Sequence, residues 1–554
     1  MTMNRRLLDS LRHRCSALEN HLIDGLVARR VSRREFIRHG SVLGLSLPVL
    51  GGAASAVGLS GLSAVSHSAR AASPGGTIRV GQIVPAAAID PLKIADGGGI
   101  TVVSQVAETL VLTGGDLAAR PVLAESWSPN KDGTVWTFKL RQGVKFHSGK
   151  TMNADDVVAT FDRLADPNNG SNALSALTGT LSKGGTRKVD DYTVEFHLDA
   201  ANGNFPYIVS TDNYNAVILP ADYKGDFEQN MNGTGPFKLE KYTPKVGASF
   251  VRNTEYWGGQ VLPDRLEVSF YSDYQPQILA LQGGQIDIIQ QIPVLQGVGL
   301  LNDPNVDIIA TPSTAHQQVH MRTDLDPFKD KRVRRAIALC LDRPKIVQGL
   351  MKGRAQIGND SPFAAAYPST DPNVKQREKN IAEAKELMAA AGMNGFETTL
   401  TTEKYLEIPD YGVLIQNAVK EIGGKININQ LDQGAYYGDA VYGKSPWLDS
   451  DMGITDYGHR GVPNVFLSAP LKSDGTWNSA HFKNPEYDKL VTSYIASLDL
   501  DSQRTTAGKI QNLLLDETPV LFVYFYDFLT ATKKGAAGVQ PTAMGQLILS
   551  QATL

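Results

Sequence analysis

The most regular hydrophobic pattern in the chain runs through Thr134–Leu140. The large apolar residues Trp136, Phe138 and Leu140 alternate there with Val135, Thr137 and Lys139. A period of two places the first set on one face of an extended segment. The sequence therefore predicts a half-buried strand. The turn before it falls at Lys131-Asp132-Gly133, where glycine supplies a positive φ.

A helical periodicity follows this strand after a short second strand predicted at Val144–Phe146. Asn153 is a favourable N-cap residue, and Asp156 stands three positions later, as in a capping box. Apolar residues then recur at helical spacing: Val157, Phe161 and Leu164. We interpret this unit, a hairpin leading into a capped amphipathic helix, as scaffold without chemistry of its own.

Comparable patterns predict the other main elements. Strands are expected at 76–83 and 190–198, and helices at 101–112, 342–353 and 381–392. The segment 85–99, which ends in three glycines, is expected to be a loop. Three arginines, Arg332, Arg334 and Arg335, are interpreted as a solvated helix face. This mixture indicates an α/β protein, and 554 residues are enough for two or more domains.

The start of the chain differs in charge from the rest. Residues 1–71 hold ten Lys/Arg and four Asp/Glu, so that 44 basic and 53 acidic residues remain and give residues 72–554 a net charge of −9. An acidic body argues against nucleic acid or an anionic membrane as partner.

The basic segment contains a twin-arginine motif, Ser32–Arg38, whose signature residues are Arg33, Arg34 and Phe36. An uncharged run rich in Gly, Ala and Ser follows, and Ala69-Arg70-Ala71 fits a small-x-small cleavage pattern. We therefore predict a signal peptide over 1–71, cleaved between Ala71 and Ala72 and read by the twin-arginine export machinery. A transmembrane anchor is the alternative.

Several chemistries find no support in the sequence. Cys15 and Cys340 are the only cysteines, too few for a disulfide framework, a zinc cage or an iron–sulfur cluster. No phosphate-binding loop, dinucleotide fingerprint or zinc-protease motif is present. We expect no cofactor, no metal site and no catalytic residues. An exported enzyme remains the rival hypothesis, because twin-arginine export often carries cofactor enzymes.

One family resemblance covers nearly all of residues 76–540. Residues 121–164 contain PVLAESW, DGTVWTFKLRQGVKFHSG and ADDVV at fixed spacing, and GTGPFKL, RNTEYWG and DPFKDKRVRRAI follow later. This pattern resembles the extracellular solute-binding proteins of ABC importers, in their family 5 branch for peptides, nickel and opines.

The resemblance implies a class II periplasmic-binding-protein fold, in which two α/β lobes are joined by a two-strand hinge. The implied boundaries are lobe I at 72–311, with an extra subdomain at 118–245, and lobe II at 312–520. Residues 521–554 would then return to lobe I.

The resemblance also nominates ligand-binding residues. Dipeptide-binding relatives carry an aspartate in a G-W-x-G-D stretch that pairs with the ligand's α-amino group, and Met452–Asn464 corresponds to it, with Ile454 in place of the tryptophan. Asp456 is therefore the candidate anchor, or else a structural loop aspartate.

The neighbours of Asp456 are further candidates: Tyr457, His459 and Arg460. Arg460 would pair with a ligand carboxylate or form a salt bridge between the lobes. Thr402 occupies the position where these relatives hold a carboxylate with a basic residue, so Lys404 is the candidate substitute.

The function implied is that of a periplasmic, monomeric binding protein. It would capture a small solute by lobe closure and deliver it to the permease subunits of an ABC transporter. A short peptide is the leading ligand. Nickel chelates, opines, glutathione, sugars and haem remain alternatives.

Overall fold

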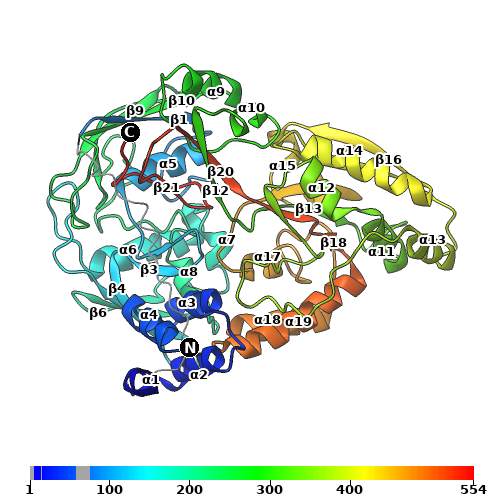
Figure 1. Ribbon diagram of the computed structural model, residues 1–554, viewed down its shortest axis with the longest axis horizontal. Helices are drawn as coiled ribbons and strands as arrows, with labels where there is room; N and C mark the ends of the chain where they lie inside the picture. Colours follow the sequence, from blue (N-terminus) through cyan, green and yellow to red (C-terminus); the bar gives the residue numbers. More distant parts are fainter. Residues whose placement is uncertain (1–4, 14, 58–74) are drawn as a thin grey trace.

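The computed structural model describes residues 5–13, 15–57 and 75–554. It consists of two α/β lobes side by side, each built around a seven-stranded sheet (Figure 1). The predicted cleavage site at Ala71 and Ala72 lies outside the described residues. Within the described part of the chain, no helix has the length and apolarity needed to cross a membrane.

The sheet of lobe I is centred on β1, which pairs in parallel with β10 and β11. Its strands in spatial order are β12 (Val306–Thr311), β20 (Phe528–Lys533), β11 (Ile288–Ile289), β1 (Thr77–Ile83), β10 (Arg265–Tyr271), β9 (Gly247–Arg252) and β8 (Phe237–Thr243). Ile78 and Val80, which lie on one face of β1, are buried, whereas Arg79 between them is exposed.

The sheet of lobe II has β13 and β17 at its centre, paired antiparallel. In spatial order its strands are β14 (Ala355–Ile357), β19 (Tyr524–Tyr526), β13 (His316–Met321), β17 (Met452–Tyr457), β15 (Phe396–Glu403) and β16 (Gly424–Leu431), and β18 (Val520–Leu521) also pairs with β13. The parallel strands β15 and β17 therefore end at the same edge of the sheet.

The predicted extra subdomain contains a separate four-stranded sheet. Its strands are β4 (Ala124–Pro129), β5 (Val135–Leu140), β7 (Thr193–His197) and β6 (Thr186–Asp190). The alternating residues of β5 pack as predicted, with Trp136 and Phe138 fully buried. The Phe138 and Phe196 rings meet edge to face at 5.3 Å, a favourable aromatic geometry.

Short ribbons and helices complete the chain. The ribbons pair β2 (Val111–Thr113) with β3 (Ala119–Pro121), and β21 (Gln540–Pro541) with β22 (Leu547–Ile548). The helices of lobe I and its subdomain are α5 (Gly97–Val106), α6 (Ala154–Ala165), η1 (Pro167–Asn169), α7 (Leu174–Leu177), α8 (Phe205–Ile208), α9 (Tyr274–Gln282) and α10 (Val298–Leu301).

Lobe II holds most of the remaining helices, and its longest one is α19. They are α11 (Lys331–Cys340), α12 (Arg343–Gly349), α13 (Ile381–Ala390), α14 (Ile408–Val419), η2 (Lys420–Ile422), α15 (Gln433–Tyr437), α16 (Pro446–Asp449), α17 (Asn464–Ser468), α18 (Pro485–Ala496) and α19 (Leu500–Glu517). The predicted N-caps hold: Asn153 forms a capping box with Asp156, and Asp342 caps α12.

The chain crosses between the two sheets twice. Residues 312–315 lead from β12 to β13, and Asp527 links β19 to β20. Because β18 and β19 still belong to the sheet of lobe II, the second crossing falls after the predicted boundary at residue 520.

In the described part of the chain, four helices precede the first strand: α1 (Arg5–Arg12), α2 (Ala17–Val27), α3 (Arg33–Val42) and α4 (Leu47–Ala56). They share a hydrophobic cluster that includes Phe36, fully buried, and Leu500 of α19. The twin-arginine motif coincides with the start of helix α3, whose N-cap is Ser32.

This N-terminal segment contacts both lobes. On the lobe I side, Trp127 Nε1 donates to the Val42 carbonyl oxygen at 2.9 Å. On the lobe II side, Arg504 Nη1 donates to the Arg30 carbonyl oxygen at 2.9 Å. Arg38, almost completely buried, reaches both sides through the carbonyl oxygens of Asp116 and Ala366.

Three predictions about elements were wrong. Residues 85–96 contain no helix or strand, as expected, but the glycines 97–99 form the first turn of α5, capped by Asp96, and the helix ends at Val106, so the end of the predicted loop and the helix bounds 101–112 are wrong. Val144–Phe146 makes only an isolated bridge.

Arg334 was also misjudged, because it is 2 % exposed and belongs to no solvated face. Its guanidinium donates to the carbonyl oxygens of Phe328 and Glu517, at 2.6 and 2.5 Å. These contacts fasten α11 to the end of α19, so the side chain is structural.

Candidate functional site

Asp456 lies near the end of β17, directly opposite Gln317 of β13. Its Oδ1 accepts a hydrogen bond from the Tyr526 hydroxyl at 2.8 Å, and part of the residue remains accessible. Burial raises the pKa of Asp456 to about 8, and the charges of Glu403 and Glu407 add to the shift. The carboxyl is therefore mainly protonated at pH 7, and a nearby cation would favour its ionised form.

Glu403 and Glu407 are two site residues that the sequence did not reveal. Glu403 ends β15, is fully buried, and accepts hydrogen bonds from Gln433 at 2.7 Å and Tyr437 at 2.8 Å. The Asp456 backbone N–H also points to Glu403, at 3.5 Å. Burial raises the pKa of Glu403. The sequence carried no signal for it, because the parallel pairing of β15 with β17 is set by the tertiary structure.

Glu407 connects this group to lobe I. It precedes α14, is 3 % exposed, and accepts a hydrogen bond from the Leu295 backbone N–H at 3.2 Å. Burial raises its pKa as well. Since Leu295 belongs to lobe I and the three carboxylates to lobe II, the acidic group lies where the two lobes meet.

Tyrosines surround the three carboxylates. Electrostatic interactions connect Asp456 with Tyr274 of lobe I and with Tyr405, Tyr524 and Tyr526 of lobe II. Tyrosine combines an apolar ring with a hydroxyl that donates or accepts, so the group can hold both apolar and polar parts of a solute.

Two predicted binding residues lie elsewhere. Lys404 follows Glu403 but points to the opposite side, where its side chain is 56 % exposed and its Nζ stands 3.3 Å from Asp432. Tyr457 is buried against His316, with ring centroids 5.5 Å apart. Neither residue is part of the acidic group, so a ligand carboxylate would not meet Lys404 there.

His459 and Arg460 lie at a second point of contact between the lobes. His459 Nδ1 accepts a hydrogen bond from the Thr314 backbone N–H at 3.0 Å, and burial lowers the His459 pKa to about 3. The ring is therefore neutral, and its 3.8 Å contact with Asp212 of lobe I is not an ion pair.

Arg460 also interacts electrostatically with Asp212. Burial raises the pKa of Asp212 to about 7, and the positive charge of Arg460 opposes that rise. Both residues line a cavity of about 40 Å³ together with Tyr207 and Tyr214. The Arg460 guanidinium donates to the His459 carbonyl oxygen at 2.7 Å. It thus faces lobe I at the junction and does not touch Asp456.

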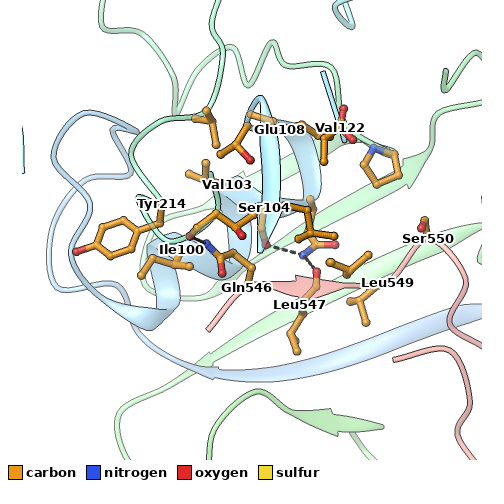
Figure 2. A pocket seen from close by; sticks show the side chains of 18 of the residues that line it. Ile100, Val103, Ser104, Glu108, Val122, Tyr214, Gln546, Leu547, Leu549 and Ser550 are labelled. Atoms are coloured by element: carbon orange, nitrogen blue, oxygen red, sulfur yellow. Dashed lines mark hydrogen bonds between the residues drawn. The ribbon is translucent and has the colours of Figure 1, made fainter. Parts of the chain in front are cut away.

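A larger cavity, of about 180 Å³, lies inside lobe I (Figure 2). Its walls are mostly apolar and include Val103, Val122 and Leu547. Glu108 at its edge accepts hydrogen bonds from Thr234, Tyr256 and Trp257, at 2.9, 2.6 and 2.8 Å. Burial raises the pKa of Glu108 to about 7. Because three donors already satisfy this carboxyl, we interpret it as part of the lobe's framework.

Metal binding finds no geometric support in residues 5–13, 15–57 and 75–554. No group of three or more His, Cys, Asp or Glu side chains is placed there to hold a metal ion. Cys340 is buried, and burial raises its thiol pKa to about 12, which disfavours the thiolate that metals bind.

The structure has two α/β lobes that are connected by two crossings and carry ionisable groups at their junction. This arrangement is that of a two-lobed binding protein that closes on a solute. The family model for bacterial extracellular solute-binding proteins, family 5, matches residues 118–478. The chain therefore belongs to this family, whose members are solute-binding proteins of ABC transporters.

Curated relatives match over most of their length. Heme-binding protein A of Haemophilus influenzae is 28 % identical over 73 % of this chain and 78 % of its own. Di/tripeptide-binding protein 2 of Pseudomonas aeruginosa is 27 % identical over 79 % of this chain and 87 % of its own.

Solved structures share the fold. The periplasmic binding protein DppA of Helicobacter pylori, in complex with the peptide STSA, superposes with a TM-score of 0.72 at 23 % identity, over 87 % of this chain and 98 % of its own. The substrate-binding protein CtaP of Listeria monocytogenes gives 0.76 at 22 % identity, over 87 % and 99 %. These likenesses confirm the predicted two-lobed fold.

Proposed function

We propose that the protein captures a short peptide between its lobes and delivers it to the permease of an ABC importer. The observation that carries this proposal is Asp456, a part-accessible carboxyl at the lobe junction without an ion-pair partner among the described residues. A ligand ammonium would favour ionised Asp456 and form a charge-assisted hydrogen bond with it. Relatives named for di- and tripeptide binding support this choice of ligand.

The spacing of charged groups supports a ligand of only a few residues. Arg460 follows Asp456 by four positions, and a chain rises by at most about 3.6 Å per residue, so their backbones are at most about 14 Å apart. An extended peptide of two to four residues would span that distance. In this arrangement Arg460 turns from Asp212 to the peptide carboxylate when the ligand binds.

Mass spectrometry of the solute that co-purifies with the protein from its native host tests this proposal. A di- to tetrapeptide is the expected finding. An opine, a haem or an organic nickel complex bound in stoichiometric amount would contradict it.

We further propose that the protein is exported through the twin-arginine pathway, matures at Ala72 and acts as a periplasmic monomer. The motif Arg33-Arg34-x-Phe36 and the absence of catalytic and nucleotide-binding motifs support this assignment. N-terminal sequencing of periplasmic protein should yield Ala72, and Arg33→Lys with Arg34→Lys should leave the precursor in the cytoplasm. Light scattering should give one chain per particle. A periplasmic product that keeps residues 1–71 would contradict the cleavage.

A further inference from the structure

The lobe junction holds more carboxyl groups than one ligand ammonium can pair with. Asp456, Glu403 and Glu407 converge there, and the charges of both glutamates act on Asp456. Each glutamate is at least nine-tenths buried. Buried carboxylates without counter-charges are costly, so their close grouping calls for a positive partner.

The described residues supply no such partner. The carboxyl groups accept hydrogen bonds from neutral donors only, namely the side chains of Tyr526, Tyr437 and Gln433 and the backbone N–H groups of Leu295 and Asp456. The nearest cations along the chain are engaged elsewhere: Lys404 lies beside Asp432, and Arg460 faces Asp212 of lobe I. In the described part of the protein, none of the three carboxylates has an ion-pair partner within 4.0 Å.

A buried amide beside the acidic group is also incompletely bonded. Gln317 is 1 % exposed and lies opposite Asp456. Its Oε1 accepts a hydrogen bond from the Tyr524 hydroxyl, whereas its Nε2 has no partner in good hydrogen-bond geometry among the described residues, although the Gln317 side chain interacts with the Asp456 carboxyl and lowers its pKa. Buried donors are normally paired, so a ligand that places an acceptor next to its cation would complete the site. The first carbonyl of a peptide stands in that position relative to its ammonium.

From this arrangement we infer that the site selects short peptides whose first residue is lysine or arginine. The α-ammonium would meet Asp456, the first carbonyl would accept from Gln317 Nε2, and the basic side chain would supply the second positive charge opposite Glu403 and Glu407. The part-accessible rings of Tyr274 and Tyr405 offer faces on which a side-chain cation can rest. This inference rests on the proposed function and narrows its ligand.

Three dipeptides of equal length test the inference on the full chain by isothermal titration calorimetry: Arg-Ala, Ala-Ala and Glu-Ala. We expect Arg-Ala to bind at least about tenfold more tightly than Ala-Ala, and Glu-Ala to bind most weakly. Equal affinity for Arg-Ala and Ala-Ala would overturn the charge preference and leave peptide capture standing. Failure of all three dipeptides, with a non-peptide solute found in the purified protein, would overturn both proposals.

Glu403→Gln separates a specificity role from a structural one. Glutamine keeps an oxygen that can accept from Tyr437 but removes the charge. We expect the preference for Arg-Ala over Ala-Ala, measured as the ratio of the two affinities, to fall severalfold. Glu397→Gln, at the exposed start of the same strand β15, is the matched control and should keep the preference. Equal losses for both dipeptides in Glu403→Gln would overturn the role assigned to this charge.

Discussion

The substitution Asp456→Asn should have opposite effects on binding and on stability. Asparagine has nearly the size of aspartate, and its amide oxygen can still accept from the Tyr526 hydroxyl, which now donates at 2.8 Å. The substitution therefore removes the charge with little change in packing. The carboxylate charge strengthens ligand binding, whereas burying that charge destabilises the folded protein without a ligand.

The expected loss of affinity follows from the ligand's ammonium. Without the carboxylate, a desolvated ammonium is left unpaired, which costs about 2–5 kcal/mol. At 25 °C this corresponds to a roughly 30-fold to several-thousand-fold weaker affinity. Calorimetry with the co-purifying ligand measures it directly.

The expected gain in stability follows from the pKa of Asp456. Burial raises it from 3.8 to about 8, so the folded state holds the proton more tightly than the unfolded state. The contribution of Asp456 to stability is therefore most favourable below about pH 4 and becomes less favourable as the pH rises towards 8. A pKa raised from 3.8 to about 8 sets an upper limit of roughly 6 kcal/mol on the free energy by which ionised Asp456 destabilises the folded state. We expect a destabilisation of ~2 kcal/mol, because the site around a charged group relaxes and admits water.

Thermal unfolding of the ligand-free protein at pH 4.5 and pH 8.5 distinguishes this reasoning from a packing effect. Asp456→Asn should unfold at a clearly higher temperature than the wild type at pH 8.5 and at nearly the same temperature at pH 4.5. Asp451→Asn is the matched control, because Asp451 is exposed just before the same strand. A variant that is less stable at pH 8.5, or retains full affinity, would refute the role assigned to Asp456.

Three further predictions concern pH and packing. Affinity for a peptide should rise up to about tenfold per pH unit from pH 5 towards 8 as Asp456 ionises, then fall as the ligand's α-amino group loses its proton near pH 8; a flat profile in calorimetry would contradict this. Asp360→Ala should destabilise the fold by about 3–5 kcal/mol, because it strands the buried Arg343 and Arg377, both 2.6 Å from that carboxylate, and an unchanged melting temperature would speak against it. In the uncleaved precursor, Phe36→Ala should release the N-terminal helices from the body, which limited proteolysis would show as faster cleavage before residue 75; unchanged cleavage would count against docking of this segment.

Local elements were readable from the sequence wherever one short-range rule dominated. Alternation alone located β5, and the pair Asn153 and Asp156 located the start of α6, because a strand's period and a helix cap depend on neighbours within a few positions. Three consecutive glycines, by contrast, suggested a loop, yet Asp96 caps them as a helical turn that packs against the sheet. Tertiary contacts outweighed the weak helix propensity of glycine there.

The candidate site was only partly visible in the sequence. Asp456 was identified by its place in the stretch that resembles the dipeptide-binding relatives. Glu403 and Glu407 were not identified, since more than fifty positions separate Glu403 from Asp456 along the chain. Lys404 was nominated as the basic residue nearest to Thr402, and the sequence did not tell that its side chain points away from the site.

The sequence by itself determined the family, the alternating and capped segments and the candidate carboxyl at 456, because these depend on local spacing. Only the tertiary structure decided which charges share the lobe junction. The parallel pairing of β15 with β17 places Glu403 beside Asp456, and the packing of the two lobes places the Leu295 backbone N–H at Glu407. Whether an ionisable side chain is buried, and with which partners, depends on contacts between segments remote in sequence, and those contacts set its pKa and the ligand that it can hold.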